Sequence, residues 1–135
     1  MKKLNCVLLI DDDEPTNFLN EMIIAQLNCT ESIVAVQSGQ EALDYLCAKE
    51  GGQYPQPDLI LLDINMPGMN GWEFLERYKG LDTSQKGKVI IMMLTTSLNP
   101  DDEAKAHGIT DIKSFMKKPL TKEAFQKVLS QYFSD

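Results

Sequence analysis

Short apolar runs alternate with longer amphipathic segments five times along the chain. The nearly unbroken runs are residues 6–10, 59–62 and 89–94, and the shorter or interrupted runs are residues 33–36 and 112–116. Strands that are covered on both faces have continuous apolar sequences, so the first three runs are predicted to be central strands and the other two outer strands. The alternation as a whole predicts a parallel sheet wrapped by helices.

The segments between these runs carry helix-start signals. Serine, threonine and asparagine accept hydrogen bonds from the first amides of a helix, and proline fits its first turn. Residues of these types stand where five helices are predicted to begin: Pro15, Ser38, Asn70, Asn99 and Thr121. In the second helix, Glu41 follows Ser38 at the spacing of a capping box. The stretches 51–57 and 80–87 are predicted to be loops.

Apolar stripes predict which helix faces are buried. The predicted stripes are Leu19, Met22, Ile23 and Leu27 in the first helix, Ala42, Leu43, Leu46 and Cys47 in the second, Phe74, Leu75 and Tyr78 in the third, and Ala124, Phe125, Val128, Leu129, Tyr132 and Phe133 in the fifth. The fourth helix, which ends near Gly108, has little to bury beyond Ala104 and Ala106. It is therefore predicted to be the most mobile helix.

Composition and charge narrow the classes of function. The 135 residues, 43% of them hydrophobic, can bury one substantial core, so residues 1–135 are predicted to form a single domain. A net charge of −7 argues against binding to nucleic acid or anionic lipid. No segment fits a signal peptide or a membrane span, and the expected location is cytoplasmic. Three scattered cysteines, predicted to be buried thiols, and a single histidine argue against a disulfide framework, a zinc site and a hydrolase triad.

Polar residues follow four of the five predicted strands. They are Asp11, Asp12 and Asp13 after the first, Asp63 after the third, Thr95, Thr96 and Ser97 after the fourth, and Lys117, Lys118 and Pro119 after the fifth. In open α/β sheets the ligand crevice lies at the carboxyl ends of the strands, where the strand order reverses. If the first and third strands are neighbours there, Asp11, Asp12 and Asp63 share one pocket. Two carboxylates about 5 Å apart repel by roughly 3 kcal/mol at an effective dielectric constant of about 20, so this cluster either takes up a proton or binds a cation.

Such a pocket suits Mg²⁺, which typically takes one or two carboxylates and a phosphate while it keeps several waters. Lys118 would offer a point charge to a phosphoryl oxygen, and Thr95 a hydroxyl donor. Asp63 would then be the nucleophile that forms an acyl phosphate. Each residue alone has a simpler interpretation, as a turn aspartate, a strand-end hydroxyl or a surface lysine. Their joint order after successive strands is improbable as a coincidence.

With these residues the whole chain resembles a response regulator receiver domain of the CheY-like kind. The segment 61–71, LLDINMPGMNG, is similar to that family's phosphorylation loop, and residues 7–12, 94–95 and 118–119 match its other motifs. The resemblance implies a flavodoxin-like (βα)5 three-layer sandwich with a parallel five-stranded sheet of order 2-1-3-4-5. It also implies a phosphoacceptor regulator rather than an enzyme, one that catalyses only its own phosphorylation and dephosphorylation. Nothing remains after the fifth helix for an output domain, so a stand-alone receiver is expected.

The resemblance assigns a role to each residue of the pocket. Asp63 would receive the phosphoryl group from a phosphohistidine on a sensor histidine kinase or a histidine phosphotransfer protein. Asp12 and Asp63 would bind Mg²⁺ directly, and Asp11 mainly through water. Asn65 would bind the metal through its backbone carbonyl.

Two further expectations concern the response to phosphorylation. Thr95 and Lys118 would contact the phosphoryl group, and the peptide bond between Lys118 and Pro119 is expected to be cis. Phe115 matches the family's switch aromatic: as Thr95 moves toward the phosphate, its ring would turn inward. The face of the fourth helix, the fifth strand and the fifth helix would change shape and contact a downstream target protein. The alternative interpretation of Phe115 is an ordinary core aromatic. The chain is expected to be a monomer or a weak dimer.

Two residues depart from the family pattern. Asp13 is a third aspartate where the family needs two, and it is expected to be a helix cap or a charge at the pocket rim. Thr96 stands where a smaller residue is common, and its bulk would narrow access to the phosphoryl group.

Two other functions compete with the main one. One is a phosphatase with an aspartyl-phosphate intermediate; that class has a DxDxT pattern, and here Asn65 stands in place of its second acid. The other is a phosphorylation-independent binding module of the same fold, and the complete pocket argues against it.

Overall fold

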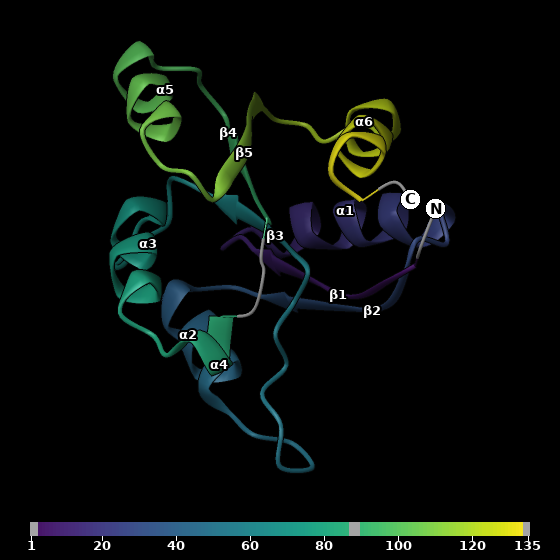
Figure 1. The fold of residues 1–135 in the computed structure, drawn as a ribbon. Helices are drawn as coiled ribbons and strands as arrows, with labels where there is room; N and C mark the ends of the chain where they lie inside the picture. The colour runs from purple at the N-terminus through teal and green to yellow at the C-terminus, as the bar shows by residue number, and fades with distance from the viewer. Residues whose placement is uncertain (1–2, 87–89, 134–135) are drawn as a thin grey trace.

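Five parallel strands form one sheet in the order β2-β1-β3-β4-β5, as predicted (Figure 1). The computed structural model describes residues 3–86 and 90–133. The strands are β1 (Leu4–Ile10), β2 (Thr30–Val36), β3 (Leu59–Asp63), β4 (Ile90–Thr95) and β5 (Ile112–Lys117). Val89, the first residue of the predicted fourth strand, lies outside the described residues.

A helix follows each strand. The helices are α1 (Glu14–Gln26), α2 (Gly39–Cys47), α3 (Gly71–Lys79), α4 (Thr83–Lys86), α5 (Pro100–His107) and α6 (Lys122–Tyr132). The one-turn helix α4 lies in a stretch that was predicted to be a loop, so α5 and α6 are the fourth and fifth helices of the prediction. The turn closes because Gln85 donates its backbone N–H to the Asp82 carbonyl at 2.9 Å, while the Gln85 side chain accepts from the Asp82 N–H at 2.9 Å.

Helices cover both faces of the sheet. Figure 1 shows α1 and α6 on one face and α2, α3 and α5 on the other. Along β1, Val7 and Leu9 pack into the core beneath α1 and α6, whereas Leu8 packs into the core on the opposite face. This alternation is the period of two that a strand imposes on its side chains. The result is the three-layer, flavodoxin-like sandwich that the resemblance implies.

The first helix buries a different face from the one predicted. Leu19 and Met22, which were predicted to be buried, are 58% and 45% exposed. The buried positions of α1 are Asn17, Asn20 and Ile24. The Asn17 side-chain amide donates to the backbone carbonyls of Asp11 (2.9 Å) and Val36 (3.1 Å), at the ends of β1 and β2. These hydrogen bonds hold the asparagine face against the sheet and leave part of the apolar stripe in solvent.

Two smaller predictions of burial are also wrong. Cys47 is exposed because it is the last residue of α2 and follows Leu46, the last core residue of that helix; the other two cysteines are buried, as predicted. Ala104 is exposed because α5 turns only one residue, Ala106, into the core.

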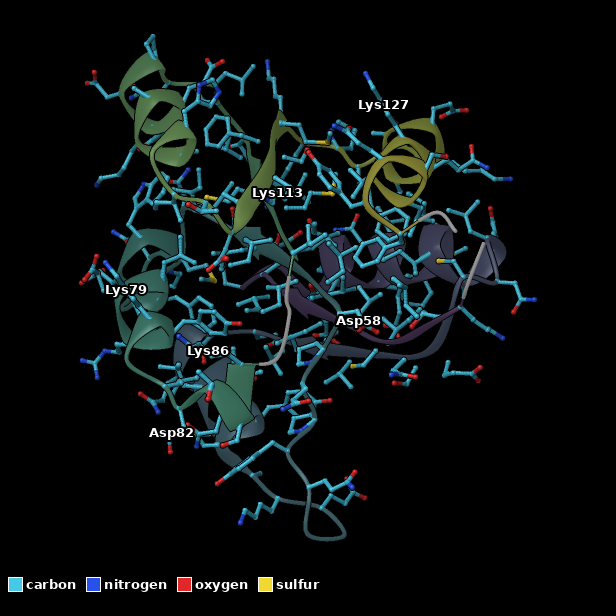
Figure 2. The ribbon with its side chains drawn as sticks, viewed as in Figure 1. Asp58, Lys79, Asp82, Lys86, Lys113 and Lys127 are labelled. Atoms are coloured by element: carbon cyan, nitrogen blue, oxygen red, sulfur yellow. The ribbon has the colours of Figure 1, made fainter. Side chains whose placement is uncertain are left out.

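Lys79 and Lys127 lie at the periphery of the molecule. Figure 2 shows Lys79 of α3 and Lys127 of α6 extending away from the sheet, and both residues are exposed. Across the described residues, no helix combines the length and the apolar character that crossing a membrane requires.

Candidate functional site

Three carboxylates meet at the carboxyl ends of β1 and β3. The two strands are direct neighbours, with Ile10 opposite Leu62, so the residues that follow them face each other across the sheet edge. One carboxylate oxygen from each of Asp11, Asp12 and Asp63 lies within 4.8 Å of the other two. Asp11 and Asp63 are each only 4% exposed, whereas Asp12 is open to solvent. The sequence predicted this cluster, and its all-oxygen donor set fits a hard divalent cation.

The Lys118 side chain lies between two of these acids. Its Nζ is 2.7 Å from Asp11 Oδ2 and 3.3 Å from Asp63 Oδ1. Lys118 directly follows β5, and its backbone N–H donates to the Thr95 carbonyl at 2.7 Å. The peptide bond to Pro119 is cis, as expected. Burial alone would lower the pKa of the Lys118 ammonium, but its hydrogen bond to Asp11 and the charges of both carboxylates raise that pKa above its ordinary value.

The pocket raises the pKa of the Asp63 carboxyl group. Burial, and after it the negative charge of Asp11, raise the pKa of Asp63 to about 6, although Lys118 and the Asn65 N–H both favour the ionised form. The Asn65 N–H lies 3.4 Å from Asp63 Oδ1. Without a bound cation, the pocket therefore holds more negative charge than its single lysine neutralises.

This pKa leads to a prediction about stability. The pKa of Asp63 is higher in the folded protein than in the unfolded chain. Ionising Asp63 therefore destabilises the metal-free folded protein as the pH rises from about 4 to about 6, and the full loss of stability remains above pH 6. Asp63→Asn is expected to raise the free energy of unfolding by about 2 to 3 kcal/mol at pH 7.5, and by little near pH 4. Urea unfolding in chelator at both pH values measures the difference. Asp44→Asn, on the exposed side of α2, controls for the loss of one negative charge. Equal stabilisation at both pH values would contradict the assignment.

The other predicted site residues do not all point into the cluster. Thr95 is buried at the end of β4, and its hydroxyl bonds within its own turn, donating to the Ser97 carbonyl at 3.0 Å. Phe115, on β5 opposite Met93, is half-buried against the core under α2 and α3. Their switching roles remain predictions, as does metal binding by the Asn65 carbonyl. Thr96, whose bulk was expected to narrow the pocket, is exposed.

The structure shows the role of Asp13, the third aspartate after β1. The Asp13 carboxylate caps α1 by accepting from the Thr16 N–H at 3.1 Å and from the Thr16 hydroxyl. The Asp13 N–H in turn donates to Asp11 Oδ1 at 3.0 Å, which helps to fix the Asp11 carboxylate. Capping is thus the observed role, and the register that assigns Asp11 and Asp12 to the pocket is confirmed.

Two supporting residues were not identified as such from the sequence. Asn17 ties the end of β1 to the end of β2, and its place in a polar stretch at the start of the first helix carries no local signal of this role. Gly71 brings the start of α3 against the backbone of the phosphoacceptor candidate. A Cβ at Gly71 would lie 2.9 Å from the Asp63 carbonyl oxygen and 2.9 Å from Ile64 Cα, so only glycine fits this approach.

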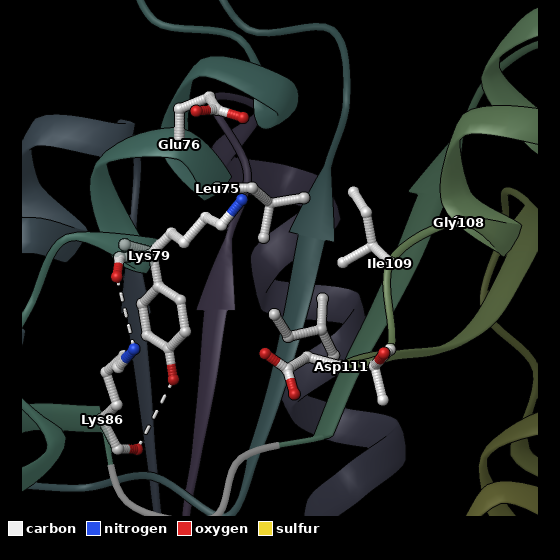
Figure 3. Close-up of a pocket in the computed structure, with 10 residues that line it drawn as sticks. Leu75, Glu76, Lys79, Lys86, Gly108, Ile109 and Asp111 are labelled. Atoms are coloured by element: carbon white, nitrogen blue, oxygen red, sulfur yellow. Dashed lines mark hydrogen bonds between the residues drawn. The ribbon is translucent and has the colours of Figure 1, made fainter.

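A cavity of about 310 Å³ lies at the other edge of the sheet (Figure 3). Its walls come from the end of α3 and from the connection between α5 and β5, where Ile109 and Asp111 lie opposite Leu75 and Lys79. Parallel strands place their amino ends here and their carboxyl ends at the acidic cluster. The cavity is therefore remote from the carboxylates.

Comparison with known proteins agrees with this arrangement. Residues 7–130 match the family model of the response regulator receiver domain. A two-component response regulator from Cytophaga hutchinsonii is 38% identical, with a TM-score of 0.82 over 96% of this chain and 97% of that one. The chemotaxis protein CheY4 of Vibrio cholerae is 25% identical, with a TM-score of 0.74 over 95% of this chain and 98% of that one.

Curated relatives are similar over most of this chain. The probable methanogenesis regulatory protein FilR2 of Methanothrix harundinacea is 31% identical over 93% of this chain and 79% of its own length. The transcriptional regulatory protein CitT of Halalkalibacterium halodurans is 33% identical over 98% of this chain. The chain spans about half the length of CitT and of several other curated relatives that it matches. The chain therefore belongs to the response regulator receiver domain family of two-component signalling, and a receiver domain is a phosphoacceptor regulator rather than a true enzyme.

Proposed function

We propose that this chain is a response regulator that accepts one phosphoryl group on Asp63, with Mg²⁺ bound, and then changes its interaction surface. The observation that carries the proposal is the position of the Lys118 ammonium, 3.3 Å from Asp63 Oδ1, beside a cluster of three carboxylates. A nucleophilic carboxylate, a cation site and a mobile positive charge are the groups that phosphoryl transfer to an aspartate needs. The proposal includes a single receiver domain over residues 1–135, a cytoplasmic location, and a monomer or weak dimer.

The donor set suits magnesium. In the proposal Asp12 and Asp63 hold the metal directly, Asp11 holds it mainly through water, and Asn65 contributes its backbone carbonyl. When bound, Mg²⁺ supplies positive charge that neutralises the phosphoryl oxygens. Asp11 keeps the Lys118 ammonium in place through their 2.7 Å ion pair, and Asp13 holds the Asp11 carboxylate from the other side.

The transfer step uses the ionised form of Asp63. A carboxylate oxygen of Asp63 forms a bond to phosphorus while the bond between phosphorus and the imidazole nitrogen of a donor phosphohistidine breaks, and the electron pair stays on that nitrogen. Because the pKa of Asp63 is about 6 without metal, the nucleophilic form predominates at neutral pH. Lys118 stabilises the negative charge on the transferring group. Thr95 then leaves its own turn to contact the phosphoryl group, Phe115 turns inward, and the face of α5, β5 and α6 changes for a target protein.

The experiment that tests the proposal is phosphorylation of the purified protein by acetyl phosphate with Mg²⁺, followed by intact-mass measurement. One added phosphoryl group, absent when a chelator replaces Mg²⁺, is the expected result. Turnover of an external phosphoester without a stable adduct would instead favour a phosphatase. No adduct under any condition would favour a phosphorylation-independent binding module.

The exposed apolar residues of α1 favour one docking position for the phosphodonor protein. Phe18 is 62% exposed and Leu19 is 58% exposed, and Met22 continues the same surface. The helix that carries them begins at the Asp13 cap, at the rim of the acidic pocket. A histidine kinase or phosphotransfer protein must place its phosphohistidine over that pocket, so this surface is where its own apolar residues would be covered.

A double substitution tests this docking surface. Phe18→Ala with Leu19→Ala is expected to lower kcat/KM for phosphotransfer from the donor protein about tenfold or more, the range of central interface residues. Phosphorylation by acetyl phosphate is expected to be unchanged, because neither side chain reaches the pocket. A parallel loss with both donors would show that the substitutions damage the pocket and would overturn the docking assignment.

A further inference from the structure

One indole joins α3 to α5. The Trp72 Nε1–H donates to Asp102 Oδ1 at 3.0 Å, and Lys105 Nζ lies 5.0 Å from the centroid of the same ring. Asp102 and Lys105 are three positions apart on α5, so both lie on the side of that helix that faces α3. The indole thus binds an anion through its edge and a cation over its face.

The α3 end of this link is attached to the phosphoacceptor strand. Trp72 is the second residue of α3, and Gly71 before it packs directly on the backbone of Asp63 and Ile64. The Gly71 N–H donates to the Ile64 carbonyl at 2.8 Å. A shift of the backbone at Asp63 therefore moves the start of α3, and the Trp72 indole with it.

The α5 end of the link is weakly held by other contacts. Ala106 is the one buried residue of α5, so the helix has little apolar surface to fix its position. The cavity in Figure 3 separates the last turns of α3 from the connection after α5, where Leu75 and Lys79 face Ile109 and Asp111 across open space. Among the described residues, the side-chain hydrogen bond and the cation-π contact that join α3 to α5 are both made by Trp72, and the cavity leaves room for α5 to move.

We propose that Trp72, Asp102 and Lys105 form a clasp, in which Trp72 is a positioning residue that couples the state of Asp63 to the position of α5. The inference rests on the proposed function and adds to it the route by which phosphorylation reaches one helix of the output face. In the unphosphorylated protein the clasp holds α5 against α3. Phosphorylation displaces the start of α3, and the indole transmits that displacement to α5.

The clasp is tested by comparing Asp102→Ala with Asp101→Ala. Both substitutions remove one carboxylate from the first turn of α5, but only Asp102 contacts the indole among the interactions of the described residues. Amide hydrogen exchange in α5 of the unphosphorylated protein is expected to rise about fivefold in Asp102→Ala, the ratio that a typical net hydrogen-bond contribution implies. The change in Asp101→Ala is expected to be clearly smaller. Asp102→Asn, which keeps an oxygen acceptor, is expected to restore most of the protection.

Phosphorylation with acetyl phosphate and Mg²⁺ then tests the coupling. Trp72 is the only tryptophan, so the tryptophan emission reports on this indole alone. The emission and the α5 exchange rate are expected to change on phosphorylation in the parent protein, and the change in exchange to fall by at least about half in Asp102→Ala. A protein that gains the phosphoryl mass without either change would overturn the clasp and leave phosphoryl transfer to Asp63 standing, as would equal exchange in the two alanine variants. Absence of the adduct by mass would overturn the proposed function, and the coupling with it.

Discussion

Asp63→Asn is expected to abolish phosphorylation of the chain by acetyl phosphate and by a donor protein. The amide that replaces the carboxylate is not a nucleophile toward phosphorus, and it also removes a charge from the metal cluster. The neighbouring acids are poor substitutes for different reasons. Asp11 is held by Lys118 and by the Asp13 N–H, whereas Asp12 is exposed at the pocket edge. Intact mass after incubation with Mg²⁺ and acetyl phosphate is the measurement, with loss of about a thousandfold or more in rate as the expected minimum.

Asp13→Asn is the matched control for that result. Asparagine caps helices about as well as aspartate, so α1 is expected to keep its start and the variant to keep its adduct. The two variants together separate the aspartate that reacts from the one that only shapes the loop. Loss of the adduct in Asp13→Asn as well would mean that the third aspartate belongs to the reactive cluster, and the division of roles after β1 would then be wrong.

The sheet and the acidic cluster could be predicted because both depend on short-range patterns. A strand that is buried on both faces must be apolar throughout, and a parallel sheet brings the carboxyl ends of its strands to one edge. The positions of Asp11 and Asp63 after two such strands, and of Lys118 after an outer strand of the same sheet, therefore indicate one site from the sequence alone. Their spacing in the folded protein, with Nζ 2.7 and 3.3 Å from the two carboxylates, confirms that geometry.

Features that depend on contacts between distant segments could not be predicted in the same way. The inward face of α1 follows from hydrogen bonds of Asn17 to Asp11 and Val36, and an apolar stripe gives no sign of them. The contact of Trp72 with Asp102 joins residues thirty positions apart and has no local signature. The orientation of the Thr95 hydroxyl, which bonds within its own turn, is one of several available to a threonine. Sequence periodicity identifies the elements that carry a site, whereas single side-chain hydrogen bonds decide how those elements are turned.

Lys118→Met is expected to change two properties of the pocket in opposite directions. Methionine keeps much of the length and apolar volume of the lysine stem but removes the charge between Asp11 and Asp63. The cluster then has no cation of its own, so Mg²⁺ is expected to bind more tightly, and the pKa of Asp63 to lie above its present value of about 6 in the metal-free protein. The metal-free protein is expected to lose about 3 kcal/mol of stability at neutral pH, because a buried carboxylate is left without its partner.

Phosphorylation is expected to fall in Lys118→Met by about a hundredfold to a thousandfold, even with Mg²⁺ saturating, because the positive charge that faces the transferring group is gone. Calorimetric titration with Mg²⁺ and the rate of adduct formation measure the two effects separately. Lys117→Met is the matched control: Lys117 is the last residue of β5, directly before Lys118, and is exposed, so neither quantity should change appreciably. A Lys118→Met protein that binds Mg²⁺ more tightly but is phosphorylated at the parent rate would show that the ammonium only balances the resting charge of the pocket. The simultaneous gain in metal affinity and loss in rate is what distinguishes a lysine that acts on the phosphoryl group from one that merely neutralises its acidic neighbours.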